Sequence, residues 1–358
     1  MIKMSDYKLS VVVPTFNTGE FLNDLVDSLI NQSIGFENIE LIFVDDASTD
    51  SLTLNLINDF VFKYPNNCKA IFLEDNSGFP GGGRNIGIKE SSADFVIVAD
   101  HDDSYEKEAL KVLYNEITKN NADIVITNFN QVFKEKIIPF KSSITKNIEV
   151  TDISKNKDIL KIPAAIWTRL FRKDFLTQNN IEFLEEMLGE DVYFAAKSSL
   201  KASKIIYLPE FYGYNYNIRD SADDKSTIHI RNKKYLMAML EGYYEISKML
   251  AKENEEEYSK CIFNPHLTSW LYTIVISDIS DNDIKELLKR AINIFKNNYT
   301  NDPYFKGRYE NLVKFIKNNE LDLAIKEINK LKQDEKNIND SLKENKYKKL
   351  FKRVLKKN

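Results

Sequence analysis

Residues 95–103 read FVIVADHDD, an apolar stretch followed by three aspartates. The apolar part has the length and the valine and isoleucine content of a buried strand, so Asp100, Asp102 and Asp103 would lie at its carboxyl end. Ligands bind at that edge of open α/β sheets. Carboxylates so close together repel one another unless a cation joins them, and oxygen ligands suit Mg²⁺ or Mn²⁺. Taken alone, the stretch leaves a solvated turn after a strand as the alternative.

Polar residues also end or follow three other apolar segments: 15–17 after residues 9–14, Asp45 and Asp46 in residues 39–46, and Asp75 and Asn76 after residues 69–74. Stretches with helical spacing of apolar residues lie between these segments, and a further strand pattern follows at 123–127. The alternation predicts an α/β fold with a mostly parallel sheet and helices on both faces. Four strands would then direct polar ends into one crevice, as a nucleotide site requires.

The second half of the chain has a different pattern. Residues 134–154 indicate irregular strands or a loop, and a strand is predicted at 204–209. From about residue 228, four stretches have the spacing of amphipathic helices: 235–250, 258–276, 284–295 and 321–331. A length of 358 residues suits two domains, and 43% hydrophobic residues can form a substantial core. We therefore predict a catalytic domain at 1–227 and a helical domain at 228–358.

The charge is distributed unevenly along the chain. The net charge is −4, although residues 343–358 carry eight basic residues and one acidic residue. An acidic body with a basic tail is not typical of a nucleic-acid-binding protein. The tail has the pattern of a basic amphipathic helix, which suits an anionic membrane surface. Packing on its own domain or on a neighbouring subunit, and hence a homo-oligomer formed through the C-terminal helices, is the alternative.

The chain shows no sign of export or of a membrane span. Its N-terminus has no signal-peptide pattern, and no apolar run approaches the length of about 20 residues that a transmembrane helix needs. Cys68 and Cys261 are far apart and are expected to be reduced thiols. Three histidines without short spacing argue against a zinc site. We expect a cytoplasmic protein, with any membrane contact peripheral and at the inner face of the cell membrane.

Six segments, in order and spacing, resemble the family 2 glycosyltransferases of the GT-A fold, over about residues 8–220. They read VVVPTFN (11–17), FVDDASTD (43–50), DNSGFPGGGRNIGI (75–88), VADHDD (98–103), IWTRLFRKDFL (166–176) and GEDVYF (189–194). The resemblance implies a Rossmann-like nucleotide-sugar-binding domain. The segment at 75–88 is also similar to that of the poly(ribitol-phosphate) wall teichoic acid glycosyltransferases, which attach N-acetylglucosamine.

The resemblance implies a UDP-sugar as donor. Pro14 would line the base pocket, and Asp46 would accept a hydrogen bond from the uracil imide N–H. Asn76 can both donate and accept, which suits a pyrimidine edge. We expect one member of the Asp45–Asp46 pair to cap a helix N-terminus. The glycines at 81–83 would let the backbone approach a sugar or phosphate, with an ordinary glycine-rich turn as the alternative.

The resemblance also implies a divalent metal at the aspartate cluster. Asp102 would bind it directly, and Asp100 would hold the ribose or a metal-bound water. Asp103 would not contact the metal but would orient the residues that bind it. The metal would neutralise charge on the leaving diphosphate. Arg84 would bind the diphosphate or Asp100, and Arg219 would close over the diphosphate unless it is a solvated loop residue.

Asp191, in the segment GEDVYF, is implied as the general base that takes a proton from the acceptor hydroxyl. A single displacement would invert the stereochemistry, so a UDP-α-sugar would give a β-linked product. Glu190 would orient neighbouring groups. Without the resemblance, an acidic cluster on a helix surface explains both residues. Trp167 would stack on a sugar unless it belongs to the core.

These observations predict an inverting, metal-dependent glycosyltransferase. It would move a sugar, N-acetylglucosamine in the first instance, from a UDP-sugar to a hydroxyl of a cell-envelope polymer such as wall teichoic acid. Another UDP-sugar with a capsule or lipid-linked glycan as acceptor is one alternative. A nucleotidyltransferase, which would release pyrophosphate, is a second. A glycan-binding protein without catalytic activity is a third, and it would tolerate Asp191→Asn.

Overall fold

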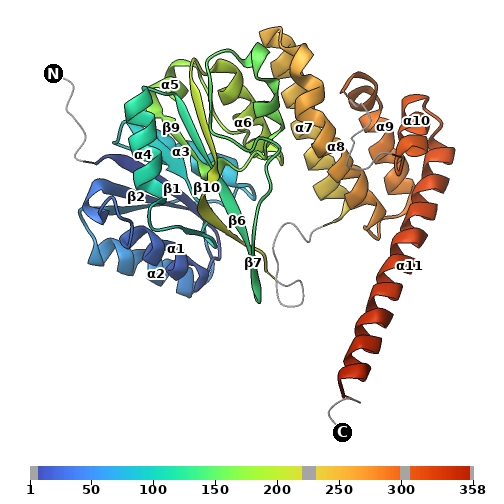
Figure 1. Cartoon of the computed structure of the whole chain (residues 1–358), viewed down its shortest axis with the longest axis horizontal. Coiled ribbons are helices and arrows are strands. Elements are labelled where there is room, and N and C mark those ends of the chain that lie inside the picture. The colour runs from blue at the N-terminus through green and yellow to red at the C-terminus, as the bar shows by residue number, and fades with distance from the viewer. Residues whose placement is uncertain (1–6, 220–230, 299–306, 355–358) are drawn as a thin grey trace. The chain divides into compact units, whose positions relative to one another are not determined.

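The computed structural model describes residues 7–219, 231–298 and 307–354, with the backbone alone for residues 264, 265, 339 and 341–354. The chain divides into two compact units, Met1–Asp224 and Lys225–Asn358 (Figure 1). The first is an α/β unit and the second is helical. The boundary predicted at 227/228 falls in the stretch 220–230, outside the described residues.

Within the described residues, the first unit is built on one ten-stranded sheet with the order β3-β2-β1-β4-β9-β6-β10-β5; β7 pairs with β6, and β8 pairs with β10. The strands are β1 (Leu9–Thr15), β2 (Ile39–Asp45), β3 (Cys68–Phe72), β4 (Phe95–Val98), β5 (Ser104–Tyr105), β6 (Ile124–Phe133), β7 (Lys136–Pro139), β8 (Ile148–Val150), β9 (Arg169–Arg172) and β10 (Ile205–Asn217). The helices are α1 (Phe21–Ile30), α2 (Ser51–Lys63), α3 (Pro80–Glu90), α4 (Ala109–Asn120), α5 (Lys173–Gln178) and α6 (Glu190–Lys201).

The half of the sheet formed by β3, β2, β1 and β4 is parallel, as predicted. Strands β1, β2 and β4 are rich in valine, isoleucine and leucine and are fully buried, which is typical of a sheet covered on both faces. Val12 is in register with Ile42 on one side and Val98 on the other. Because the strands are parallel and aligned, the polar residues that follow them lie at one edge of the sheet.

The other half of the sheet is mixed. Strand β9 runs antiparallel between β4 and β6, so the sheet is not a continuous parallel array. Strand β10 is longer than the predicted segment 204–209 and continues past Pro209 to Asn217. Its register with β6 shifts between Leu208 and Tyr212, so the proline lies at an irregularity, where a strand tolerates it. This extension brings residues 212–217 to the aspartate cluster.

The stretch 134–154, predicted as irregular strands or a loop, contains the short strands β7 and β8. Strand β7 forms a hairpin with β6, and Figure 1 shows it at an end of the first unit. Helix α2 begins at Ser51, and the Asp50 side chain caps it by accepting a hydrogen bond from Thr53 N at 2.7 Å. The expectation that Asp45 or Asp46 caps a helix is therefore wrong, because the helix starts several residues later.

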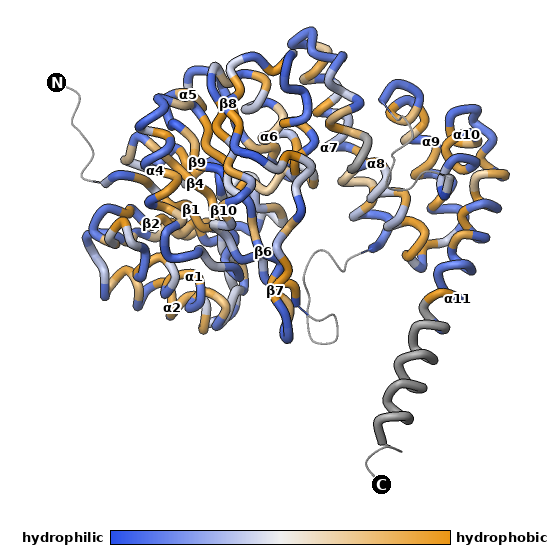
Figure 2. The backbone as a smooth tube through the Cα atoms, viewed as in Figure 1, coloured by the Kyte–Doolittle hydropathy of each residue, from blue (hydrophilic) through white to orange (hydrophobic). Residues whose placement is uncertain are grey.

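The second unit contains, in its described residues, helices α7 (Lys233–Glu253), α8 (Ser259–Val275), α9 (Asp281–Asn298), α10 (Glu310–Lys317) and α11 (Leu321–Val354). Figure 2 shows hydrophobic and hydrophilic residues alternating along these helices, whereas the strands of the first unit are mainly hydrophobic. Trp270 and Phe263 are fully buried in the second unit. Cys68 and Cys261 are free thiols, as expected.

Helix α11 extends into the basic tail, with a helical backbone as far as Val354. The side chains from residue 341 onward lie outside the described residues, and so does the amphipathic face predicted for residues 343–358. In the described part of the chain, none of the helices has both the length and the apolar character needed to cross a bilayer.

Candidate functional site

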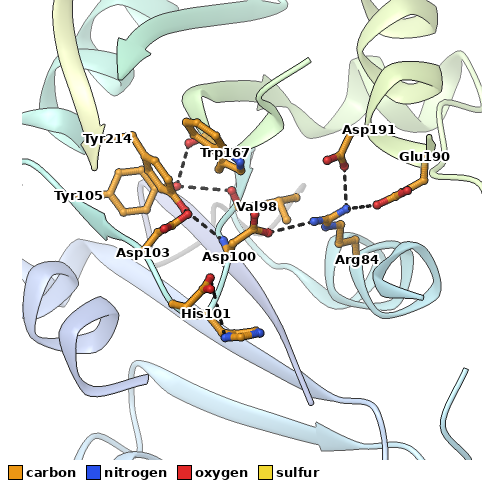
Figure 3. A network of polar contacts seen from close by, with 11 residues as sticks. Arg84, Val98, Asp100, His101, Asp103, Tyr105, Trp167, Glu190, Asp191 and Tyr214 are labelled. Atoms are coloured by element: carbon orange, nitrogen blue, oxygen red, sulfur yellow. Dashed lines mark hydrogen bonds and ion pairs between the residues drawn. The ribbon is translucent and has the colours of Figure 1, made fainter. Parts of the chain in front are cut away.

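Arg84 lies among three carboxylates, as Figure 3 shows. Its Nη1 donates to Asp191 Oδ1 at 2.7 Å and to Glu190 Oε1 at 3.0 Å, and its Nη2 donates to Asp100 Oδ1 at 2.9 Å. The Arg84 side chain is 4% exposed. Of the two partners expected for Arg84, the structure shows Asp100. The arginine thus joins two segments, at 100 and 190–191, that are far apart in the sequence.

Three elements bring these groups together. Arg84 is on α3, which begins with a proline. Proline lacks a backbone N–H, and at the first position of a helix that N–H would have no intrahelical partner. Asp100 follows β4 directly. Glu190 and Asp191 form the first turn of α6, after Gly189 in a left-handed conformation with φ 88°. The helix dipole favours carboxylates at that end, so α6 stabilises both side chains close to Arg84.

The cluster has more negative than positive charge. Burial raises the pKa of Asp191 to about 8; the charges of Glu190 and Asp100 act in the same direction, and Arg84 opposes them. Burial also raises the pKa of Glu190. Burial alone would lower the pKa of Arg84, but the three carboxylates raise it, so the guanidinium stays charged. The Asp191 side chain is 34% exposed and that of Glu190 only 8%, so Asp191 is the one that an acceptor can reach.

Asp103 and Tyr214 fix the loop that carries the aspartates. The Tyr214 hydroxyl donates to Asp103 Oδ2 at 3.0 Å and accepts from Asp100 N at 3.2 Å. Asn217 N donates to Asp103 Oδ1 at 2.7 Å, and its side chain donates to Asp102 O at 2.7 Å. Asp103 is 1% exposed, and burial followed by the charges of Asp102 and Asp100 raises its pKa. Asp103 therefore has a supporting position, and strand β10 provides its partners.

Asp102 forms an ion pair with Arg219. The guanidinium of Arg219 also lies over the ring of Phe21, 4.7 Å from its centroid. His101 Nδ1 is 4.0 Å from Asp102 Oδ1. Arg219 is therefore not a solvated loop arginine but a neighbour of the aspartate expected to bind the metal.

The donor set at the cluster suits Mg²⁺ or Mn²⁺. Within the described residues, no group of three or more histidine, cysteine, aspartate or glutamate side chains is arranged to hold a metal ion. Mg²⁺ sites that act on nucleotides commonly use one or two carboxylates and complete the shell with substrate phosphates and water. Asp102 and Asp100, with side chains 17% and 29% exposed, provide oxygen ligands of that kind. The residues therefore fit an ion whose remaining ligands come from the substrate.

The residues expected to hold the base lie at the ends of β1, β2 and β3. Asp46 accepts hydrogen bonds from Ser77 N at 3.0 Å and from Asn76 Nδ2 at 3.0 Å. In this structure Asp46 closes the turn that contains Asn76, and both residues are accessible. Pro14 is buried and lies close to Gly83: a Cβ added to Gly83 would be 3.6 Å from Pro14 Cβ. Gly83 is on α3, next to Arg84, so this group adjoins the carboxylate cluster.

The glycines at 81–83 lie in a helix, and Gly81 serves its packing. They belong to the first turn of α3, where a Cβ on Gly81 would lie 2.0 Å from the backbone oxygen of Leu184. Asn85 reinforces this contact, because its side chain donates to Phe183 O at 3.0 Å and accepts from Phe183 N at 2.8 Å. Gly81 thus lies in a packed helix turn rather than in an open loop, and the approach of the glycine segment to a sugar or phosphate stays a prediction. The role of Gly81 is to let α3 approach the segment that leads to Asp191.

We expect Gly81→Ala to lower the free energy of unfolding by about 2 kcal/mol, as overpacking of a tight contact does. The added methyl group would meet backbone rather than a flexible side chain, so the segment at 183–184 must move. Gly82→Ala is the matched control, because its Cβ would meet nothing closer than the Glu185 side chain at 3.9 Å. It should be neutral or stabilising by up to about 1 kcal/mol. Urea unfolding of the two variants checks this, and equal stabilities would contradict it.

Trp167 belongs to the core. It is 7% exposed and stacks on Tyr214 at 4.2 Å between ring centroids and on Tyr216 at 5.7 Å. Tyr105 packs edge-on against Tyr214 at 4.8 Å. Arg169 is also interior, at 2% exposed, and donates to Pro163 O. Tyr214 is a site residue that the sequence analysis missed. The alternation of Tyr212, Tyr214 and Tyr216 was a strand signal that could have indicated it.

We expect Tyr214→Phe to lower kcat/KM about tenfold, mainly through a higher KM for the donor. The phenyl ring keeps the stacking, but Asp103 loses a donor and Asp100 N loses an acceptor, and a buried unpaired group costs about 1–3 kcal/mol. Tyr216→Phe is the control, because among the described residues its hydroxyl has no hydrogen bond to either aspartate. Steady-state kinetics of both variants test the role, and equal KM values would argue against it.

Comparison with known proteins places the chain in a family. Residues 10–177 match the family described as "Glycosyl transferase family 2". The chain is 30% identical to the poly(ribitol-phosphate) beta-N-acetylglucosaminyltransferase TarS of Staphylococcus aureus (strain MW2), over 69% of this chain and 40% of TarS. It is 31% identical to the poly(ribitol-phosphate) beta-N-acetylglucosaminyltransferase TarP of Staphylococcus aureus (strain N315), over 70% of this chain and 75% of TarP. The chain thus spans less than half the length of TarS.

A solved structure shares the fold. The crystal structure of S. aureus TarS 1–349 in complex with UDP-GlcNAc matches with a TM-score of 0.70 and 23% identity, over 91% of each chain. This match covers the α/β unit and the helical region. The likeness to TarP, over three quarters of that protein, establishes the family. The chain belongs to glycosyl transferase family 2 and has the GT-A fold with a helical C-terminal region.

Proposed function

We propose that this protein is an inverting, metal-dependent glycosyltransferase that moves N-acetylglucosamine from UDP-N-acetylglucosamine to a hydroxyl of a ribitol-phosphate polymer. The observation that carries the proposal is the Arg84 cluster, in which Asp191 of α6 and Asp100 after β4 bind the same guanidinium. The printed names of TarS and TarP supply the sugar and the polymer. A cytoplasmic location, with the acceptor reached at the inner face of the membrane, is part of the proposal.

The reaction needs one displacement. The acceptor oxygen would attack the anomeric carbon while Asp191 takes its proton, and the bond from that carbon to the diphosphate would break with its electron pair leaving on UDP. Attack opposite the leaving group turns an α-linked donor into a β-linked product. Arg84 would hold Asp191 in orientation through the 2.7 Å hydrogen bond. Glu190, which shares Nη1, would restrict where that guanidinium can lie.

The leaving group is the second requirement. Asp102 and Asp100 would hold Mg²⁺ or Mn²⁺, and such an ion, when bound, neutralises charge on the departing diphosphate. Arg219 is already at Asp102 and would add a second cation at the same place. Tyr214 and Asn217 would keep the loop at 100–103 in the conformation that presents these carboxylates.

A panel of UDP-sugars with a ribitol-phosphate polymer tests the proposal. We expect UDP release that depends on the polymer and is fastest with UDP-N-acetylglucosamine. Faster turnover with another UDP-sugar would change the proposed sugar but leave the proposed reaction, glycosyl transfer, in place. Release of pyrophosphate from a nucleoside triphosphate, without UDP release, would favour the nucleotidyltransferase. Binding of polymer with no release of either product would favour the glycan-binding protein.

We expect Asp102→Ala to lower metal-stimulated donor hydrolysis about 10- to 100-fold, because the direct metal ligand is removed while Asp100 remains. Titration with Mn²⁺ and Mg²⁺, and reversal by EDTA, measure this loss. Arg219→Gln is the discriminating control: it removes the ion pair with Asp102 but keeps the carboxylate, so metal stimulation should persist. An unchanged EDTA response in Asp102→Ala would count against the metal site.

A further inference from the structure

The β6–β7 hairpin (residues 130–141) exposes apolar side chains on both of its faces. Ile137 is 62% exposed and Ile138 is 36% exposed. Ile137 is opposite Val132, and Ile138 is opposite Gln131. Because successive residues of a strand point to opposite faces, the two isoleucines face opposite sides. Among the described residues, β7 pairs with β6 alone, so its other edge is open as well.

The hairpin is also basic. It carries Lys134, Lys136 and Lys141, all exposed, against one acidic residue, Glu135. The ammonium of Lys136 lies over the ring of Phe133, 5.1 Å from its centroid. The local charge of +2 contrasts with the net charge of −4 of the chain. Lysines beside exposed isoleucines are a combination that suits an anionic interface with an apolar interior.

The hairpin is coupled to the candidate site by the sheet. Val132 is in register with Ile137 on one side and with Asn217 of β10 on the other. Asn217 donates to the Asp102 carbonyl and to the Asp103 carboxylate. Neighbouring strands lie about 4.8 Å apart, so Ile137 is about 10 Å across the sheet from Asn217. Whatever the hairpin binds is therefore brought close to the aspartate cluster.

We propose that the β6–β7 hairpin docks the protein on an anionic lipid surface, with Ile137 and Ile138 entering the headgroup region and the lysines binding lipid phosphates. A protein partner lying on one face would leave the apolar side chain of the other face in water. A lipid interface surrounds an inserted hairpin and covers both faces. A soluble phosphate polymer would use the lysines but not the isoleucines. The docking itself does not depend on the proposed function, and it deepens that function by implying an acceptor presented at a membrane.

Co-sedimentation of the full chain with vesicles tests the docking. We expect binding to phosphatidylcholine vesicles that contain phosphatidylglycerol, weakened by salt, and little binding to phosphatidylcholine alone. The triple change Lys134→Gln, Lys136→Gln and Lys141→Gln, and the double change Ile137→Ser with Ile138→Ser, should each lower binding at least about tenfold. Phe62→Ser, which removes a side chain 88% exposed on α2, is the matched control and should bind as the unaltered protein does.

Unaltered vesicle binding by both hairpin variants would overturn the proposal, and so would equal binding to neutral and anionic vesicles. Because the basic tail could also bind vesicles, Ile137→Trp adds a local readout. Its emission should be quenched by brominated lipids, while the native Trp167 and Trp270 are buried. No quenching would overturn the proposal, as would binding of soluble polyphosphate in place of vesicles. With a soluble acceptor, UDP release from the donor should be unchanged in the hairpin variants, so a failure of docking is distinguishable from a failure of the proposed function.

Discussion

Asp191→Asn should lower kcat for sugar transfer by about 10²–10⁴-fold while UDP-sugar binding persists. The amide removes the proton acceptor but can still accept the hydrogen bond that Arg84 donates at 2.7 Å, so the shape of the cluster should be kept. Transfer to the polymer measures kcat, and calorimetric titration with the UDP-sugar measures binding. Turnover within tenfold of the unaltered enzyme would exclude Asp191 as the base.

Glu190→Gln is the matched control for Asp191→Asn. Glu190 binds the same Arg84 nitrogen and is adjacent in sequence, but its side chain is 8% exposed and faces the interior. We expect a loss of less than about tenfold, since no proton transfer is removed. The pH profile is a second check. Because the pKa of Asp191 is raised to about 8 and the base must be ionised, kcat/KM should rise with pH and level off above about 8, and Asp191→Asn should remove this dependence.

Arg84→Met should lower the free energy of unfolding by about 3 kcal/mol, the lower part of the range for breaking a buried ion pair. The methionine fills a similar volume but leaves three carboxylates without their cation. We expect a loss in the lower part of that range because the side chains of Asp100 and Asp191 are 29% and 34% exposed, so water can partly hydrate them. Urea unfolding measures the loss. Lys89→Gln, a change of charge at an exposed position of the same helix, should alter stability by no more than about 0.5 kcal/mol.

The effect of Arg84→Met should depend on pH. Glu190 and Asp191 have raised pKa values in the folded protein, so their contribution favours folding at low pH and is lost as pH rises from about 4 toward 8. Without Arg84 this loss becomes larger, because the main charge that opposes the repulsion is removed. We therefore expect the deficit of the variant to be greater at pH 8 than at pH 5. Equal deficits at both pH values would mean that Arg84 acts through packing rather than charge.

The parallel half of the fold was predictable because its signals are local. Each of β1, β2 and β4 is an apolar run that ends in polar residues, and alignment of parallel strands then gathers those residues at one edge. The proximity of residues 84, 100 and 191 was not encoded locally. The resemblance to a family implied this proximity, and the structure shows it as hydrogen bonds from Arg84 to Asp191 and Asp100.

Where the structure differs from the sequence-based expectations, the cause is a contact or pairing that the local sequence does not show. The sequence shows a run of glycines at 81–83 but not that Leu184 packs against Gly81. Paired aspartates resemble a helix cap, yet Asp45 accepts a hydrogen bond from Ser48 N at 2.8 Å and Asp50 caps the helix. The sequence predicts that this strand ends at Pro209, whereas β10 continues because the shifted register with β6 accommodates the proline. Tyr214 was missed for the same reason.

The position of β10 bears on how the enzyme becomes active during biosynthesis. Among the described residues it is the last strand of the α/β unit along the chain, yet it lies between β6 and β5 inside the sheet order. Tyr214 and Asp103 are 111 positions apart, and contacts of such long range form late and slowly in folding. A nascent chain released from the ribosome only as far as β9 would therefore have its parallel half assembled but its aspartate loop unrestrained. Competence for nucleotide chemistry should arise in a single late event, when this strand inserts.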